Sequence, residues 1–227
     1  MKSSQKIVVI IPVYNENQRA VKTIKDVLRH FKGEIVVVDD GSTDNTKELV
    51  ERHFKDISRL TLISYKKNKG KGAALRVGVE MAWKKGGEAV IFIDADGQHN
   101  PKYLKKFKRK LEDNKIVFGY RMLSRKMPFL RRLGNIVAVN LIRVLFNIRK
   151  KDLLSGYLGF KKEIYEKIKW TSDRYGIETE MATKIGRNKL EFYEFKIDTI
   201  YIDKYKGVTL LDAIKVLAQI PRWYFTK

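Results

Sequence analysis

Four short apolar runs divide the first half of the chain and constrain its fold more than any other feature. They span residues 7–11, 35–38, 60–64 and 90–93, and a segment with helical spacing of apolar residues follows each of them. This alternation predicts an α/β fold with a mostly parallel sheet and helices on both faces, because parallel strands need long crossover connections. In open sheets of this kind, ligands bind beyond the carboxyl ends of the strands.

The second half continues the alternation less regularly. Residues 116–118 and 191–201 are predicted to be strands, and residues 162–168 and 176–185 are predicted to be helices. Residues 152–160 look like a polar break in apolar sequence. A chain of 227 residues without a low-complexity linker is expected to form one domain, residues 1–227.

The fourth apolar run ends at two carboxylates, Asp94 and Asp96, followed by Gln98. If the chain turns there, all three side chains can face one point. Hard oxygen ligands of this kind suit Mg²⁺ or Mn²⁺, especially a metal that substrate phosphates also hold. The alternative is that the acids cap the next helix, but Asn100 and Pro101 already form a suitable cap and first turn.

More acids follow the first two runs. Glu16, Asp39 and Asp40 are predicted at the same sheet edge as the metal-ligand candidates. Uncompensated carboxylates would repel one another, so a bound cation, hydroxyl groups or base nitrogens are their expected partners. A plain helix-capping turn over residues 39–43 remains an alternative.

Two basic residues also fall at strand ends. Lys71, between Gly70 and Gly72, could offer its ammonium group and neighbouring backbone N–H groups to a phosphate, or the segment could be a simple turn. Arg121 follows the strand predicted at 116–118. Because a charge at a strand end is not expected in the core, Arg121→Ala is expected to weaken phosphate handling without unfolding the protein.

The charge of the chain points to an anionic partner. The formal net charge is +22 and the isoelectric point is about 10, which fits nucleic acid, phospholipid or a phosphorylated substrate. The absence of cysteine excludes disulfides and thiolate metal sites, and three histidines make a zinc site improbable. No signal-peptide pattern is found at the N-terminus, so a cytoplasmic protein is expected.

Two amphipathic segments, residues 127–151 and 208–227, are candidates for helices at a membrane interface. Both combine apolar positions with basic or aromatic ones, and residues 223–225 are Trp-Tyr-Phe. The longest charge-free run in the first segment, residues 133–142, is far shorter than the roughly 20 residues that span a bilayer. Ordinary packing against a core explains these segments equally well.

Four motifs occur in an order and spacing that resemble family 2 glycosyltransferases of the GT-A fold. They are Ile11-Pro-Val-Tyr-Asn-Glu16, Val38-Asp-Asp-Gly-Ser-Thr-Asp44, Asn68-Lys-Gly-Lys-Gly72 and Asp94-Ala-Asp-Gly-Gln-His99. Gly119-Tyr-Arg121 and Asp152-Leu-Leu-Ser-Gly-Tyr157 are similar to signatures of the branch that makes dolichyl-phosphate mannose and related polyprenyl-phosphate hexoses. The resemblance covers essentially residues 7–210.

The resemblance implies roles for individual residues. Asp94, Asp96 and Arg121 would be catalytic, and Asp94, Asp96 and Gln98 would hold the metal. The nucleotide sugar would be bound by Pro12, Tyr14, Glu16, Asp39, Asp40, Lys71 and Asp94. The acceptor and its phosphate would be bound by Arg121, Arg131, Ser155 and Lys204. Lys204 stands where mannose synthases tend to carry an arginine, so the resemblance does not fix the sugar.

The expected activity is inverting transfer of a sugar from GDP-mannose, UDP-glucose or UDP-N-acetylglucosamine to dolichyl or polyprenyl phosphate. The enzyme is expected to depend on Mg²⁺ or Mn²⁺ and to bind an anionic membrane surface peripherally on its cytoplasmic side. A saccharide acceptor is the alternative, and it would need a general base such as Asp152 or Glu178. A basic nucleic-acid-binding protein is a remote alternative that the acidic cluster argues against, and the oligomeric state is left open.

Overall fold

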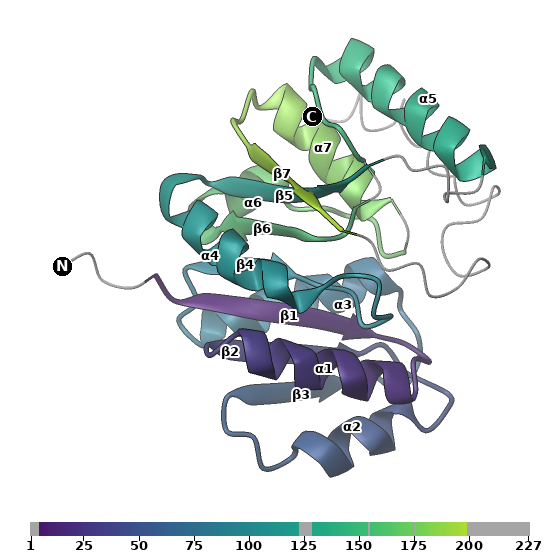
Figure 1. Cartoon of the computed structure of the whole chain (residues 1–227), viewed down its shortest axis with the longest axis vertical. Helices are drawn as coiled ribbons and strands as arrows, with labels where there is room; N and C mark the ends of the chain where they lie inside the picture. Colours follow the sequence, from purple (N-terminus) through teal and green to yellow (C-terminus); the bar gives the residue numbers. More distant parts are fainter. Residues whose placement is uncertain (1–4, 123–128, 154, 175, 199–227) are drawn as a thin grey trace.

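Seven strands form one mixed sheet in a computed structural model of the protein, which describes residues 5–122, 129–153, 155–174 and 176–198. The strand order is β3-β2-β1-β4-β6-β5-β7 (Figure 1). Pairing is parallel except where β6 meets β4 and β5. The strands are β1 (Ile7–Val13), β2 (Glu34–Asp39), β3 (Leu60–Ser64), β4 (Ala89–Phe92), β5 (Ile116–Arg121), β6 (Leu158–Lys161) and β7 (Tyr193–Ile197). The predicted α/β class with a mostly parallel sheet is confirmed.

Helices cover both faces of this sheet. In Figure 1, α1 and α4 lie in front of the strands and α3 lies behind them. The helices are α1 (Gln18–His30), α2 (Thr46–Phe54), α3 (Lys71–Lys84), α4 (Leu104–Asp113), α5 (Phe129–Phe146), α6 (Tyr165–Ile168) and α7 (Ile177–Arg187), with short 3₁₀ turns η1 (Pro101–Tyr103) and η2 (Lys162–Ile164).

Successive strand residues enter two separate apolar clusters. In β1, Val8 and Ile10 pack with α3, α6 and α7, whereas Val9 and Ile11 pack with α1, α2 and α4. Strand side chains alternate between the two sides of a sheet, and both sides here are covered. This is why the strands are continuously apolar rather than alternating apolar with polar.

Strand β6 is the element that the sequence interpretation missed. Residues 152–160 looked like a polar break, but Leu158–Lys161 form an antiparallel strand inserted between β4 and β5. Gly159 pairs with both Ile91 and Val117, and a Cβ atom on it would lie 2.9 Å from the Val90 carbonyl oxygen. A four-residue strand that requires a glycine carries almost no periodic signal.

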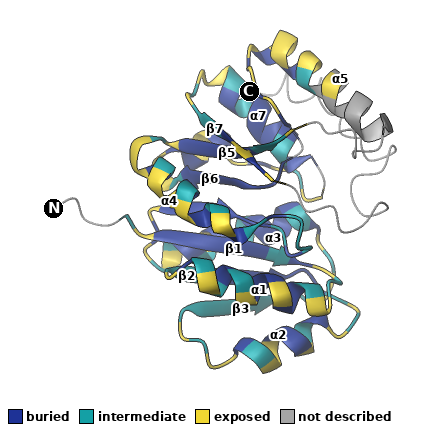
Figure 2. Cartoon of the chain, viewed as in Figure 1, coloured by how far each residue is buried: buried dark blue, intermediate teal, exposed yellow. Residues whose placement is uncertain are grey.

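Helix α5 lies within the first amphipathic segment, residues 127–151, and the described part of it has two different sides. Ile142 and Phe146 are buried against the core, whereas Val144 is 80 % exposed. In Figure 2, exposed residues (yellow) mark the side of α5 that faces away from the rest of the domain. The second amphipathic segment, residues 208–227, lies outside the described residues, so a single domain over residues 1–227 stays a prediction.

Candidate functional site

The carboxyl ends of β1, β2 and β4 meet at one edge of the sheet. The Asp40 N–H group donates to the Val13 carbonyl oxygen (2.8 Å), and the Ile93 N–H group donates to the Ile10 carbonyl oxygen (3.1 Å). These backbone bonds continue the strand pairing to the point where the loops leave the sheet. The loops after β1, β2 and β4, which carry three of the four motifs, therefore gather at this edge, as the sequence predicted.

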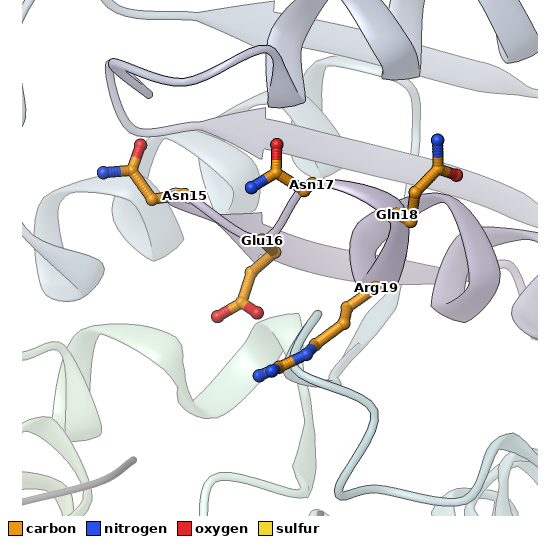
Figure 3. A pocket seen from close by; sticks show the side chains of 5 residues that line it. All are labelled: Asn15, Glu16, Asn17, Gln18 and Arg19. Carbon is orange, nitrogen blue, oxygen red and sulfur yellow. The ribbon is translucent and has the colours of Figure 1, made fainter. Parts of the chain in front are cut away.

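The loop after β1 is held in shape by the loop after β2. Asn15 and Asn17 both adopt positive φ angles (52° and 47°), which asparagine tolerates better than most residues. The Thr46 hydroxyl, fully buried, accepts hydrogen bonds from the N–H groups of Glu16 (3.0 Å) and Asn17 (2.7 Å). This geometry exposes Tyr14 and creates a pocket of about 270 Å³ lined by residues 15–19. Glu16 and Arg19 extend to the same side of the loop (Figure 3).

Asp39 and Asp40 are both buried, but their carboxylates have different hydrogen-bond partners. Burial raises the pKa of Asp39, although the carboxylate accepts a hydrogen bond from the Ser42 N–H group (3.3 Å). The Asp40 carboxylate accepts the N–H groups of Lys69 and Gly70 (both 2.8 Å) and so ties two motifs together. Helix α2 begins only at Thr46, whose N–H group donates to Asp44, so neither Asp39 nor Asp40 caps it.

Asp94 and Asp96 follow β4 on a turn closed by their own neighbours. Asp96 accepts hydrogen bonds from the backbone N–H group (2.9 Å) and the side-chain amide (3.0 Å) of Gln98. Burial and the nearby charge of Asp94 raise the pKa of Asp96. Burial also opposes ionisation of Asp94, but the ammonium group of Lys71, 2.8 Å away, outweighs it and lowers that pKa.

The side chains at this turn offer oxygen atoms of the chemical kind that divalent cations prefer. Among the described residues, no group of three or more His, Cys, Asp or Glu side chains is arranged to hold a metal ion. Two carboxylates and the Gln98 amide oxygen are hard ligands that leave coordination positions for phosphate oxygens and water. Asn100 accepts the Lys102 N–H group at the start of η1, as predicted, so the acids are not needed as caps.

His99 supports this turn and was not singled out from the sequence as a site residue. The Asp94 N–H group donates to His99 Nδ1 (3.3 Å), and the imidazole ring stacks on Tyr157 at a centroid distance of 5.0 Å. Burial lowers the pKa of His99, which keeps Nδ1 available as an acceptor. Its place at the end of the Asp94–His99 motif was the signal that could have identified it.

Lys71 reaches the same edge from the start of α3. Its ammonium group lies 2.8 Å from Asp94 Oδ1 and 3.0 Å from Glu178 Oε1. Burial alone would lower the pKa of Lys71, but these two carboxylates raise it well above its ordinary value. The N–H groups of Gly72 and Ala73 donate to the Asp173 carbonyl oxygen and that of Gly70 donates to Asp40, so these three groups are already engaged within the protein.

Arg121 and Asp152 form a buried ion pair beside the site. Arg121 Nε and Nη2 donate to the two carboxylate oxygens of Asp152 at 2.7 and 3.1 Å, and the Arg121 N–H group adds a third bond (3.1 Å). The Asp152 side chain is 2 % exposed, and the guanidinium group overrides burial and lowers its pKa. Lys150, also buried, donates to the Asp152 carbonyl oxygen and lies over the Phe118 ring.

This pairing changes what is expected of Arg121→Ala. The sequence suggested that the fold would survive unaffected, but the substitution removes the guanidinium group that binds both oxygens of the buried Asp152 carboxylate. We expect a loss of about 3 kcal/mol in the free energy of unfolding, measured by urea denaturation. Arg109→Ala, on the exposed side of α4, is the control. An Asp152→Asn, Arg121→Ala double variant should recover part of the loss, and an unchanged urea midpoint for Arg121→Ala would refute the structural role.

The structure describes the remaining acceptor-site candidates to different extents. Ser155 is fully buried, and its hydroxyl group has no hydrogen-bond partner among the described residues. The backbone of Arg131 belongs to α5, but its side chain is not among the described parts. Lys204 lies outside the described residues. Pro12 pairs with Val38 at the carboxyl ends of β1 and β2.

Comparisons with known proteins are consistent with this geometry. The model of the family described as "Glycosyl transferase family 2" matches residues 8–169. A UDP-N-acetylglucosamine–dolichyl-phosphate N-acetylglucosaminyltransferase of Methanococcus voltae is 28 % identical over 94 % of this chain and 94 % of its own length. A dolichol-phosphate mannosyltransferase of Pyrococcus furiosus is 29 % identical over 96 % of this chain and 64 % of its own length.

Solved structures support the fold. The crystal structure of glucosyl-3-phosphoglycerate synthase from Mycobacterium tuberculosis, in complex with Mn²⁺, UDP and phosphoglyceric acid, superposes with a TM-score of 0.76. The match covers 100 % of this chain and 81 % of that chain at 20 % identity. At this level of sequence identity, the match supports a shared fold but not a shared substrate.

Proposed function

The chain belongs to glycosyl transferase family 2, and from this premise we propose that it transfers a hexose or N-acetylhexosamine from a nucleotide sugar to a polyprenyl phosphate. The observation that carries the proposal is the gathering, at one sheet edge, of the Asp94–Gln98 oxygen ligands, Lys71 and the Arg121–Asp152 pair. Relatives named as dolichyl-phosphate sugar transferases match at least 94 % of the chain, which supports the lipid acceptor.

The donor is proposed to lie across the loops after β1, β2 and β4. Tyr14 is exposed and Glu16 lines the pocket formed by the next residues, and we propose that both contact a base or ribose. Asp39 stands at the adjacent strand end. Asp40 is assigned a supporting role, because both of its oxygens already accept backbone N–H groups. GDP-mannose, UDP-glucose and UDP-N-acetylglucosamine remain the candidate donors.

Asp94, Asp96 and Gln98 are the proposed ligands of Mg²⁺ or Mn²⁺. When bound, the metal would neutralise the charge that develops on the nucleoside diphosphate leaving group. Lys71 and Arg121 add two cationic groups near the same edge, and cations placed where negative charge develops stabilise the transition state. His99 holds the backbone of Asp94 and so keeps the ligand turn in place.

The state of the two general-base candidates favours a phosphate acceptor over a saccharide. Asp152 is engaged on both oxygens by Arg121 and its pKa is lowered, which makes it a weak proton acceptor. Glu178 accepts a hydrogen bond from Lys71. A phosphate monoester has a second pKa near 6, so it is already largely dianionic at neutral pH and needs no base.

The reaction is then one displacement. An oxygen of the acceptor phosphate forms a bond to the anomeric carbon while the bond from that carbon to the nucleoside diphosphate breaks. No proton has to move, and the configuration at the anomeric carbon inverts. Arg121 and the buried hydroxyl of Ser155 are the proposed contacts of the acceptor phosphate within the described residues.

A matrix of donors and acceptors tests this function. The protein is incubated with each of the three nucleotide sugars, with Mg²⁺ or Mn²⁺, and with polyprenyl phosphate, a saccharide mixture or no acceptor, and products are identified by mass spectrometry. A glycosyl phospholipid from one donor is the expected product. Product only with the saccharide would overturn the lipid acceptor, and salt-sensitive oligonucleotide binding without any sugar turnover would favour the nucleic-acid alternative.

We also propose that the protein docks on the cytoplasmic face of an anionic membrane, where a polyprenyl phosphate presents its headgroup. No helix among the described residues is long and apolar enough to cross a membrane. Support comes from the outward side of α5, where Ile136, Leu141, Val144 and Leu145 are exposed together with Arg143. Apolar side chains next to basic ones are typical of helices that lie in the headgroup region.

Val144→Asp is expected to reduce binding to vesicles that contain anionic lipid by about tenfold, because it removes apolar surface and adds repulsion. Co-sedimentation at low salt measures the effect, and high salt should release the wild-type protein. Ser58→Asp, an equal charge change at an exposed residue between α2 and β3, is the control. Equal binding by the two variants would remove α5 from the proposed interface.

A further inference from the structure

Lys71 supplies a positive charge between two carboxylates, even when no metal is bound. Its ammonium group lies between Asp94 Oδ1 (2.8 Å) and Glu178 Oε1 (3.0 Å), and the side chains of Lys71, Asp94 and Glu178 are 25 %, 25 % and 16 % exposed. One of these carboxylates belongs to the proposed metal-ligand turn after β4, and the other comes from the start of α7. The lysine therefore links the turn to α7.

The backbone around Lys71 is built to hold it there. The Asp173 carbonyl oxygen accepts the N–H groups of Gly72 (2.6 Å) and Ala73 (3.1 Å), and Trp170 Nε1 donates to the Gly72 carbonyl oxygen (2.9 Å). A Cβ atom on Gly72 would lie 2.0 Å from the Ser172 carbonyl oxygen, so the segment before α7 packs directly on the start of α3. This contact fixes the point from which the Lys71 side chain departs.

Gly156 closes the third side of the cluster. A Cβ atom there would lie 2.8 Å from Lys71 Nζ, 3.0 Å from Asp94 Oδ2 and 3.1 Å from Glu178 Oε1. A side chain at this position would push Lys71 Nζ or the carboxylate oxygens aside. Gly156 therefore lets the segment just before β6 lie close against the three charged groups.

We propose that Lys71 is a built-in counter-cation for Asp94, which a divalent metal must displace from that carboxylate and which Glu178 then retains. The inference rests on the proposed function, because it takes Asp94 as a metal ligand. A carboxylate oxygen already engaged by an ammonium group is a poor ligand for a second cation, and the two cations repel each other. Glu178, already in contact, keeps Lys71 in the site after it leaves Asp94.

The consequence is a coupling between metal and donor. In the free protein, Lys71 competes for Asp94, so metal binding is weak. A nucleoside diphosphate brings negative charge that attracts both the metal and the lysine, and its oxygens complete the metal coordination. Metal and nucleotide therefore bind with positive cooperativity, and the protein does not hold a metal in the catalytic position without a donor.

Mn²⁺ binding measured by electron paramagnetic resonance tests this inference without an activity assay. Free Mn²⁺ is titrated with wild-type protein, Lys71→Met, Lys71→Arg and Lys84→Met, each alone and with UDP or GDP. Lys84, exposed at the far end of α3, controls for the change in net charge. Without nucleotide, Lys71→Met should bind Mn²⁺ roughly tenfold more tightly than wild type, whereas Lys71→Arg and Lys84→Met should resemble wild type.

The titrations with UDP or GDP distinguish a failure of the Lys71 inference from a failure of the proposed function. UDP or GDP should tighten Mn²⁺ binding by the wild-type protein more than by Lys71→Met. If Lys71→Met binds free Mn²⁺ no more tightly than wild type, the counter-cation role is refuted while the metal-dependent function stands. If no protein binds Mn²⁺ with either nucleotide, both the inference and the proposed metal role fail. Circular dichroism checks folding, and Lys71→Gln replaces Lys71→Met if that variant does not fold.

Discussion

Asp96→Asn is expected to reduce sugar transfer by at least about 100-fold while the protein remains folded. The substitution removes a charged oxygen ligand from the proposed metal site. The turn should survive, because the asparagine oxygen can still accept the Gln98 N–H group and the Gln98 side-chain amide can turn to offer its oxygen to the new amide group. Product formation with saturating donor, Mn²⁺ and acceptor is the measurement.

Two comparisons make this result interpretable. Asp44→Asn is a change of the same kind at a carboxylate that, among the described residues, accepts the Thr46 N–H group, and it is expected to leave turnover within a few-fold of wild type. The wild-type protein should lose turnover when a chelator removes divalent metal and regain it when Mn²⁺ is added back. Full turnover of the wild-type protein in the presence of the chelator would contradict the metal role.

A large loss of stability is expected for Glu180→Ala. The Glu180 side chain is 1 % exposed, and its oxygens accept the N–H and hydroxyl groups of Thr171 (2.8 and 3.1 Å) and Ser172 (2.9 and 2.6 Å). Lys184 adds an ion pair at 3.0 Å. Alanine leaves these donors without an acceptor, which should lower the free energy of unfolding by about 3 kcal/mol or more and the melting temperature by about 6–12 °C.

Glu166→Ala is the control, because that glutamate is 80 % exposed and its loss should shift the melting temperature little. The Glu180 contribution should also depend on pH. Burial opposes ionisation, but the Ser172 and Lys184 contacts lower the pKa of Glu180 below its ordinary value of 4.5. A lowered pKa gives stability that is present above pH 4.5 and is lost as the pH falls through the folded-state pKa.

The stability difference between wild type and Glu180→Gln should therefore be largest near neutral pH and shrink below pH 4.5. Urea unfolding at a series of pH values measures it. A difference that is constant down to pH 3 would mean that the charge of Glu180 does not stabilise the segment that packs on α3.

The repeated units of the first half could be predicted from sequence because their information is local. Apolar runs of four or five residues, each followed by a helical pattern, predicted β1 to β4 and the helices on both faces of the sheet. The insertion of β6 could not be predicted in the same way. Its four residues pair with β4 and β5, which are distant in sequence, and the requirement for Gly159 arises from the Val90 carbonyl oxygen across the sheet.

The same distinction between local and long-range information applies to the candidate site. The sequence by itself determined which residues gather at this edge, because the proposed ligands Asp94, Asp96 and Gln98 and the acids after β1 and β2 lie within a few residues of strand ends that the apolar pattern reveals. Only the tertiary structure decided which partner each charge takes. Asp40 binds backbone N–H groups, Asp152 is neutralised by Arg121, and Lys71 lies between Asp94 and Glu178. The physical reason is that charge pairing depends on distances of about 3 Å between side chains tens of residues apart, and packing of the sheet and α7 sets those distances.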